Sequence, residues 1–245
     1  MFTKLKYLHR AWKYKNVDDK TELKFITSQL KEGDTVFDIG ANKGGYTYWM
    51  LKSSGHKGKV FAFEPQPYLF DYLNKIKSIF GFSNLYVSNN AVSDFTGKTT
   101  LLIPNNNKPS SPGARLDSPS EDKSYYREVS VDVIQLDDFV FSKNLTPALL
   151  KVDVEGFEYQ VFKGSEKVLK TYKPHMVFEC EQRHCKGHTV NDVINYLLNL
   201  DYKGFFVYKG NLKPVAEFSV EKYQSEELLK AGVKKGYSNN FIFKA

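Results

Sequence analysis

The sequence has little cysteine, no long apolar run and no glycine pattern of the NAD-binding kind, and each absence excludes a class of protein. Two cysteines occur in 245 residues, Cys180 and Cys185, too few for the disulfide framework of a small secreted domain. No apolar run approaches the ~20 residues of a membrane-spanning helix. The first ten residues lack the apolar stretch and small-residue cleavage site of a signal peptide. We therefore expect a cytoplasmic globular protein.

The missing glycine pattern is G-x-G-x-x-G, and the stretch closest to it is Thr35–Met50, TVFDIGANKGGYTYWM. Its first residues predict a buried strand, its glycines a tight turn, and Tyr46–Leu51 the start of a helix. This order is typical of a nucleotide-binding α/β unit, with the ligand over the helix N-terminus. Asp38 at the strand end would repel a pyrophosphate but suits a sulfonium. The turn therefore favours S-adenosylmethionine over NAD.

A second carboxylate strengthens this interpretation. The next expected strand, Lys59–Glu64, ends in an acid that is followed by Pro65. A carboxylate at the end of the second strand, about 20 residues or slightly more after the first turn, commonly binds a ribose diol. We predict this role for Glu64, and a solvated strand-end carboxylate is the alternative.

The net charge of +7 comes mostly from lysine and is scattered along the chain. Proteins that bind nucleic acids usually carry arginine-rich, clustered basic patches, so no nucleic-acid partner is expected. Two interpretations of the charge stay open. One is a lysine-rich solvated surface, and the other is weak attraction to anionic glycans or a membrane surface.

The chain predicts one α/β domain, residues 33–245, preceded by a helical extension over residues 1–32 with a helix from Lys20 to Lys31. Residues 97–136 predict a β-hairpin insertion. Its loop, 104–126, is either a mobile lid or binding loop, or a surface excursion without a role. The last strand, Asn240–Lys244, is expected to be an antiparallel edge strand.

Candidate catalytic residues follow two further strands. Asp153 lies near the end of the strand Leu149–Val154, while Glu181 ends the next expected strand, Met176–Glu181, and His184 follows it. His184 is the best-placed general base. A divalent ion held by Asp153, Glu179 and Glu181 is a possible but less favoured way to activate a hydroxyl. A zinc site is not favoured either, because Cys180, His184, Cys185 and His188 lie too close together in sequence.

Five motifs together resemble the FkbM family of methyltransferases, from about residue 33 onward. They are Asp38–Gly44, Phe63–Pro67, Asn90–Asp94, Leu136–Asp138 and, most specifically, Lys151–Glu158 (KVDVEGFE). The resemblance implies the Rossmann-like, seven-stranded class I methyltransferase fold, mostly parallel with an antiparallel last strand. It also implies S-adenosylmethionine-dependent O-methylation of a hydroxyl on a sugar, a glycan or a specialised metabolite, leaving S-adenosylhomocysteine.

The expected cofactor-binding residues lie in the glycine turn, after the second strand, after the third strand and at the end of a central strand. They are Asp38, Gly40, Ala41, Asn42, Gly44, Tyr46, Glu64, Pro65, Asn90, Ala91 and Asp153. The alternative functions are an RNA-modifying methyltransferase and an NAD-dependent oxidoreductase, and the missing glycine pattern disfavours the oxidoreductase.

Overall fold

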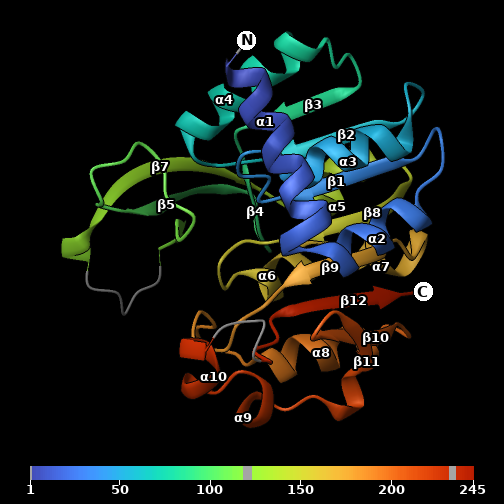
Figure 1. The fold of residues 1–245 in the computed structure, drawn as a ribbon, viewed down its shortest axis with the longest axis vertical. Coiled ribbons are helices and arrows are strands. Elements are labelled where there is room, and N and C mark those ends of the chain that lie inside the picture. The colour runs from blue at the N-terminus through green and yellow to red at the C-terminus, as the bar shows by residue number, and fades with distance from the viewer. Residues whose placement is uncertain (1, 118–122, 232–235) are drawn as a thin grey trace.

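The computed structural model describes residues 2–117, 123–231 and 236–245, and its centre is a twisted, mostly parallel sheet (Figure 1). The strand order is β11-β10-β12-β9-β8-β1-β2-β3. The strands are β1 Thr35–Ile39, β2 Lys59–Phe63, β3 Leu85–Ser88, β8 Pro147–Val152, β9 His175–Glu179, β10 Lys203–Tyr208, β11 Asn211–Pro214 and β12 Asn240–Lys244. The predicted α/β class is confirmed, and β11 is a strand beyond the seven that the resemblance implied.

Both faces of the sheet are buried because side chains of each central strand alternate between two apolar clusters. In β1, Phe37 and Ile39 belong to one cluster and Val36 to the other. Helices α2 (Lys20–Gln29), α3 and α4 contribute to the cluster that holds Val36, and α5 to α8 contribute to the opposite one. The helices after α2 are α3 Gly45–Ser54, α4 Pro67–Phe80, α5 Leu136–Ser142, α6 Glu158–Lys163, α7 Glu166–Tyr172, α8 Val190–Leu198, α9 Val220–Tyr223 and α10 Glu226–Ala231.

The N-terminal segment is helical as predicted, but it is divided. Helix α1 (Phe2–Lys13) runs into a single π-helical turn, η1 (Tyr14–Asp18), and then into α2 (Lys20–Gln29). Asp19 stands at the N-cap of α2 without making a side-chain capping bond. Helix α1 is fixed to the body where Trp49 Nε1 donates to the Ala11 carbonyl, at 2.7 Å.

A second, smaller sheet forms the predicted hairpin insertion and projects from the body (Figure 1). Its order is β4-β7-β5-β6, and β5 pairs antiparallel with β7. The strands are β4 Ala91–Val92, β5 Gly97–Pro104, β6 Arg115–Leu116 and β7 Tyr126–Ile134, with a 3-10 turn η2 at Lys123–Tyr125. Part of the expected mobile loop, residues 118–122, lies outside the described residues, and the rest of it contains β6 and η2.

The last strand differs in position from the prediction. β12 is antiparallel to both of its neighbours, as expected, but those neighbours are β9 and β10, so it lies inside the sheet. The edge is formed by β11 instead. Phe241, Ile242 and Phe243 explain the placement, because all three are fully buried and an edge strand would expose part of this apolar run. Among the described residues, no helix is both long and apolar enough to span a bilayer.

Candidate active site

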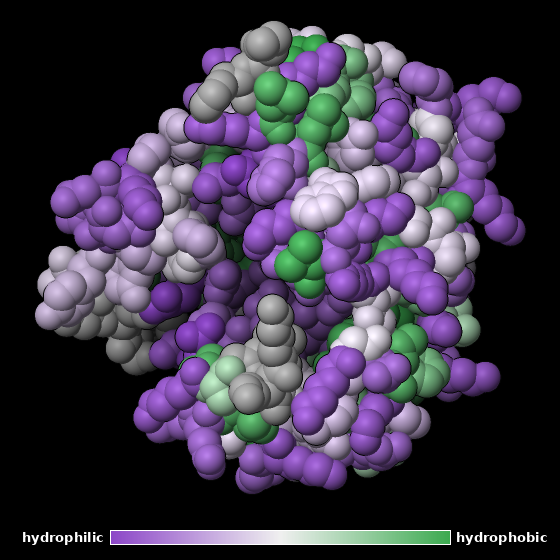
Figure 2. Space-filling model, viewed as in Figure 1, coloured by the Kyte–Doolittle hydropathy of each residue, from purple (hydrophilic) through white to green (hydrophobic). Residues whose placement is uncertain are grey.

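The carboxyl ends of β1, β2 and β8 meet at a cavity of about 270 Å³, which we call the cofactor cavity. Figure 2 shows a hollow with hydrophilic walls on this face, between the β5–β7 hairpin and the end of α1. The predicted cofactor residues in its wall are Gly40, Asn42, Glu64, Pro65, Asn90, Ala91 and Asp153. Four others, Asp38, Ala41, Gly44 and Tyr46, do not line this cavity.

The turn after β1 approaches the end of β8 so closely that Gly40 is required. A Cβ on Gly40 would lie 1.8 Å from the Asp153 carbonyl oxygen, and its φ of +76° is itself unfavourable for other residues. Gly44, at φ +71°, is the N-cap of α3 in the left-handed conformation. The side chain of Tyr7 on α1 fixes this turn by donating to the Gly44 carbonyl at 3.0 Å.

Glu64 presents a carboxyl group to the cofactor cavity from the end of β2. The backbone N–H of Asn42 donates to Oε2 at 2.7 Å and that of Gln66 donates to Oε1 at 3.0 Å. These bonds hold the carboxyl group between the two loops that end β1 and β2. Burial nevertheless raises the pKa of Glu64 to about 7, against the lowering effect of the two backbone donors.

Asp38 lies beneath the cavity rather than in its wall. It is fully buried, and Thr47 Oγ1 donates to its carboxylate. Lys151 Nζ lies 3.6 Å from Asp38 Oδ1 and 3.2 Å from Asp153 Oδ2, and donates to the Gly40 carbonyl at 3.0 Å. Burial opposes the charge on Lys151, but Asp153 and Asp38 outweigh it and raise the pKa of the ammonium group.

Lys151 was not among the predicted site residues. Its spacing offered a signal, because residues 151 and 153 of a strand share one face. A lysine two residues before a strand-end acid can therefore ion-pair with it.

A second cavity of about 230 Å³ adjoins the first, and we call it the inner cavity. Tyr14, Asp153 and Glu179 line both cavities, and Tyr46 lines only the inner one. Asp153 therefore stands where the two cavities meet.

The other two candidate catalytic residues line neither cavity. Glu181 is buried and accepts hydrogen bonds from Arg183 Nε, Tyr237 OH and Asn239 Nδ2. Burial alone would raise the pKa of Glu181, but the hydrogen-bond donors outweigh burial and lower this pKa to about 2. His184 Nδ1 lies 3.0 Å from Glu155 Oε2.

Glu179 faces the cavities in place of Glu181. Asn239 Nδ2 donates to its Oε1 at 2.7 Å and also bonds Glu181. Burial, Asp153 and Glu181 hold the pKa of Glu179 well above its usual range. The sequence indicated Glu179 only as a possible metal ligand.

The hairpin insertion supplies part of the cofactor cavity, which the sequence did not assign. Its lining residues are Leu101, Pro112, Ala114, Arg115 and Leu116. Two reciprocal bonds attach it to the loop after β2, where Gln66 Nε2 donates to the Ser111 carbonyl and Ser111 N–H donates to Gln66 Oε1, both at 3.0 Å.

The two cysteines lie close together after β9, with Cys180 Sγ 4.0 Å from Cys185 Sγ. In the part of the chain that the structure describes, no group of three or more His, Cys, Asp or Glu residues is arranged to hold a metal ion.

The sequence profile of one protein family, described as the methyltransferase FkbM domain, matches residues 38–203. The match contains the glycine turn, Glu64, the hairpin insertion and Asp153, so it covers the described lining of the cofactor cavity except Tyr14.

Two curated relatives were found. The chain is 25% identical over 176 residues to the hexuronic acid methyltransferase AglP of Haloferax volcanii, covering 67% of this chain and 64% of the relative. It is 32% identical over 105 residues to the ribosomal RNA large subunit methyltransferase E of Buchnera aphidicola, covering 38% of this chain and 47% of the relative. The chain thus spans about half to just under two thirds of these relatives.

Among solved structures, a methyltransferase FkbM from Methylobacillus flagellatus is similar in fold. The TM-score is 0.55 at 14% identity, and the alignment covers 98% of this chain and 54% of that one.

Proposed function

Because the chain belongs to the FkbM methyltransferase family, we propose that it transfers a methyl group from S-adenosylmethionine to a hydroxyl oxygen of a sugar, a glycan or a specialised metabolite. The observation that carries this proposal is the cofactor cavity itself. Its wall combines the glycine turn after β1 with the buried carboxyl group of Glu64 after β2.

The residues of the cavity fit this cofactor. The tight turn at Gly40 packs against the Asp153 carbonyl, which puts both residues in the cavity wall, and Glu64 is placed to accept hydrogen bonds from a ribose diol. Asn90 and Ala91 follow β3, where the adenine ring is expected. S-adenosylmethionine supplies the methyl group when it is bound. The other predicted cofactor residues, Asp38, Ala41, Gly44 and Tyr46, would act from just outside the wall by shaping the turn and its charge.

We propose that Asp153 is the general base that accepts the proton of the acceptor hydroxyl. Of the three candidate catalytic residues, Asp153 is the one that lines both cavities, and the ion pair with Lys151 at 3.2 Å orients its carboxylate. Glu181 and His184 would then position the chain after β9, Glu181 through Asn239 and His184 through Glu155. A divalent ion held by carboxylates is the alternative activator.

Methyl transfer to RNA is a second candidate, supported by the 32% identity to the ribosomal RNA methyltransferase over 38% of this chain. The net charge of +7 is compatible with it. The alignment with AglP covers more of the chain, 67%, and favours the sugar acceptor.

Calorimetric titration with S-adenosylhomocysteine, with NAD as the control, tests the cofactor. Transfer of labelled methyl from S-adenosylmethionine to a glycan panel and to ribosomal RNA then tests the acceptor. We expect S-adenosylhomocysteine to bind and NAD not to bind. We also expect label in the glycans and not in the ribosomal RNA. Absence of S-adenosylhomocysteine binding would overturn the proposal, and label in RNA alone would select the second candidate.

A further inference from the structure

The inner cavity adjoins the cofactor cavity and has a second connection toward the surface. It shares Tyr14, Asp153 and Glu179 with the cofactor cavity. It shares Asp18, Asp19, Glu179 and Asn240 with a wider cavity of about 620 Å³, which lies between the start of α2, the end of β10 and the start of β12. A molecule bound there would have one end beside the cofactor and would have room for a longer remainder.

The walls of the inner cavity are suited to a hydroxyl-rich ring. Tyr14 and Tyr46 meet edge to face, with ring centroids 5.7 Å apart, and supply flat aromatic surface with polar ends. Asp19, Glu179 and Asn240 supply acceptors and an amide donor around them. Tyr14 belongs to η1, and single π-helical turns occur frequently at functional sites.

The charges on these walls disfavour an anion. Lys151 is the one cation among the described lining residues, and it is already paired with Asp38 and Asp153. Asp19 and Glu179 have no such cation in the wall. Burial, partly offset for Asp19 by Tyr46, raises the pKa of both carboxyl groups, to about 6 for Asp19. A ligand carboxylate would add another like charge to this poorly solvated space.

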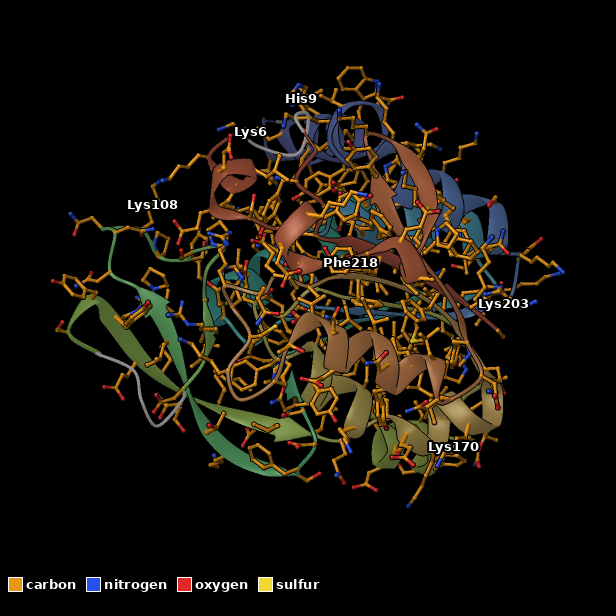
Figure 3. The ribbon with its side chains drawn as sticks, turned by 90° about the horizontal axis from the view of Figure 1, so that it is seen from below. Lys6, His9, Lys108, Lys170, Lys203 and Phe218 are labelled. Atoms are coloured by element: carbon orange, nitrogen blue, oxygen red, sulfur yellow. The ribbon has the colours of Figure 1, made fainter. Side chains whose placement is uncertain are left out.

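Other cations line the neighbouring spaces rather than the inner cavity itself. Lys6, His9, Arg10 and Lys13 line a groove along α1 that meets the inner cavity at Tyr14 and Asp18. Lys20 and Lys209 line the wider cavity. Figure 3 shows Lys6 and His9 on α1 and Lys108 on the insertion, all at the periphery of the molecule. Burial and the charges of Arg10 and Lys108 lower the pKa of Lys43, so these cations also influence one another outside the inner cavity.

We propose that the inner cavity is the acceptor site and that it binds an uncharged, hydroxyl-rich ring in preference to the corresponding uronic acid. This inference rests on the proposed methyl transfer and narrows the class of acceptor. The ring that receives the methyl group would differ in charge from the hexuronic acid named for AglP.

The test uses the full-length protein saturated with S-adenosylhomocysteine and two matched pairs of probes. These are p-nitrophenyl glucoside with p-nitrophenyl glucuronide, and p-nitrophenyl galactoside with p-nitrophenyl galacturonide. Ligand-observed saturation-transfer NMR at pH 7.5 reports their binding. We expect at least one hexoside to bind at least about tenfold more tightly than its uronide.

The charge argument is tested with Asp19→Asn and with the double variant Asp19→Asn, Glu179→Gln. Asp19→Asn removes one ionisable carboxyl group and the double variant removes both, and each should reduce the preference to less than about threefold. Glu221→Gln, an exposed position on α9, is the matched control and should keep it. Circular dichroism and melting temperature check folding, and the single variant carries the test if the double variant does not fold.

Equal or tighter binding of the uronides would overturn the inference, and so would absence of binding by both hexosides. An unchanged preference in a folded variant would overturn the role of the carboxylates. Calorimetry with S-adenosylhomocysteine distinguishes the two levels of the argument. Failure at that step refutes the proposed function, whereas failure of the sugar preference with intact cofactor binding refutes only this inference.

Discussion

At the scale of single residues, the raised pKa of Glu64 predicts that cofactor affinity depends on pH. A ribose diol donates to the ionised carboxylate, while the pKa of the free group is raised to about 7 by burial. Cofactor binding below that pH therefore carries the cost of removing a proton, and affinity should rise as pH increases from 6 to 8. Calorimetry with S-adenosylhomocysteine should show this rise, and Glu64→Gln should remove it.

The same variant should weaken binding at pH 8 by roughly 1.5–3 kcal/mol, since hydrogen bonds to a charged acceptor are lost. Glu32→Gln, at an exposed position, serves as the control. A Glu64→Gln protein with the wild-type affinity and pH profile would show that this carboxyl group does not contact the ribose.

Asp153 and His184 make opposite predictions for turnover. Asp153 lines both cavities and His184 lines neither. Asp153→Asn should therefore lower kcat by about two to four orders of magnitude, and His184→Ala should lower it by less than about tenfold. Steady-state kinetics with the acceptor found above would measure both.

If His184 is the base, that order reverses. Chelation by EDTA should leave activity unchanged. Loss of activity in EDTA, restored by Mg²⁺ or Mn²⁺, would instead indicate a metal held by the carboxylates.

The sequence predicted the positions of Glu179 and Glu181 along the chain but not the direction in which the Glu181 side chain points. Both acids were expected at one strand end, where the period of two would place them on the same face. The strand stops at Glu179, so Glu181 belongs to the following loop, and its direction is set by Arg183, Tyr237 and Asn239. Two of these partners are more than fifty residues away in sequence, so no local pattern could place it.

At the scale of elements, the insertion is attached to the cofactor motif by the side chain of Gln66. Gln66→Ala would remove both bonds to the Ser111 backbone. We expect amide hydrogen exchange of residues 111–116 to accelerate and the affinity for S-adenosylhomocysteine to fall, because those residues line the cofactor cavity. Gln29→Ala on α2 is the control. Unchanged exchange would show that β6 alone holds the loop.

Local patterns predicted most elements because they depend on nearby residues. The buried run of β1, the glycine turn and the alternating strand β7 all follow from composition and period. The position of β12 does not. Its antiparallel direction suits a short last strand, but its insertion between β9 and β10 depends on strands that lie far away in the sequence. The cavity wall supplied by the insertion was missed for the same reason.

At the scale of the whole molecule, cofactor binding should stabilise the fold. A ligand at 100 times its Kd adds about 2.7 kcal/mol to the free energy of unfolding. For a chain of this size that corresponds to a rise in Tm of about 5–10 °C. A thermal-shift assay should show the rise with S-adenosylhomocysteine and no rise with NAD at the same concentration. An equal rise with NAD would contradict the cofactor assignment.

The interior position of β12 sets an order of events during synthesis. The strands that form the cofactor cavity are complete once β9 has emerged from the ribosome, whereas β10 and β11 join the sheet only through β12. Asn240, the first residue of β12, also lines the inner cavity. At ~5–20 residues per second, several seconds separate the translation of these two parts of the sheet. We therefore expect the part of the sheet that forms the cofactor cavity to be translated before the inner cavity has all of its lining residues.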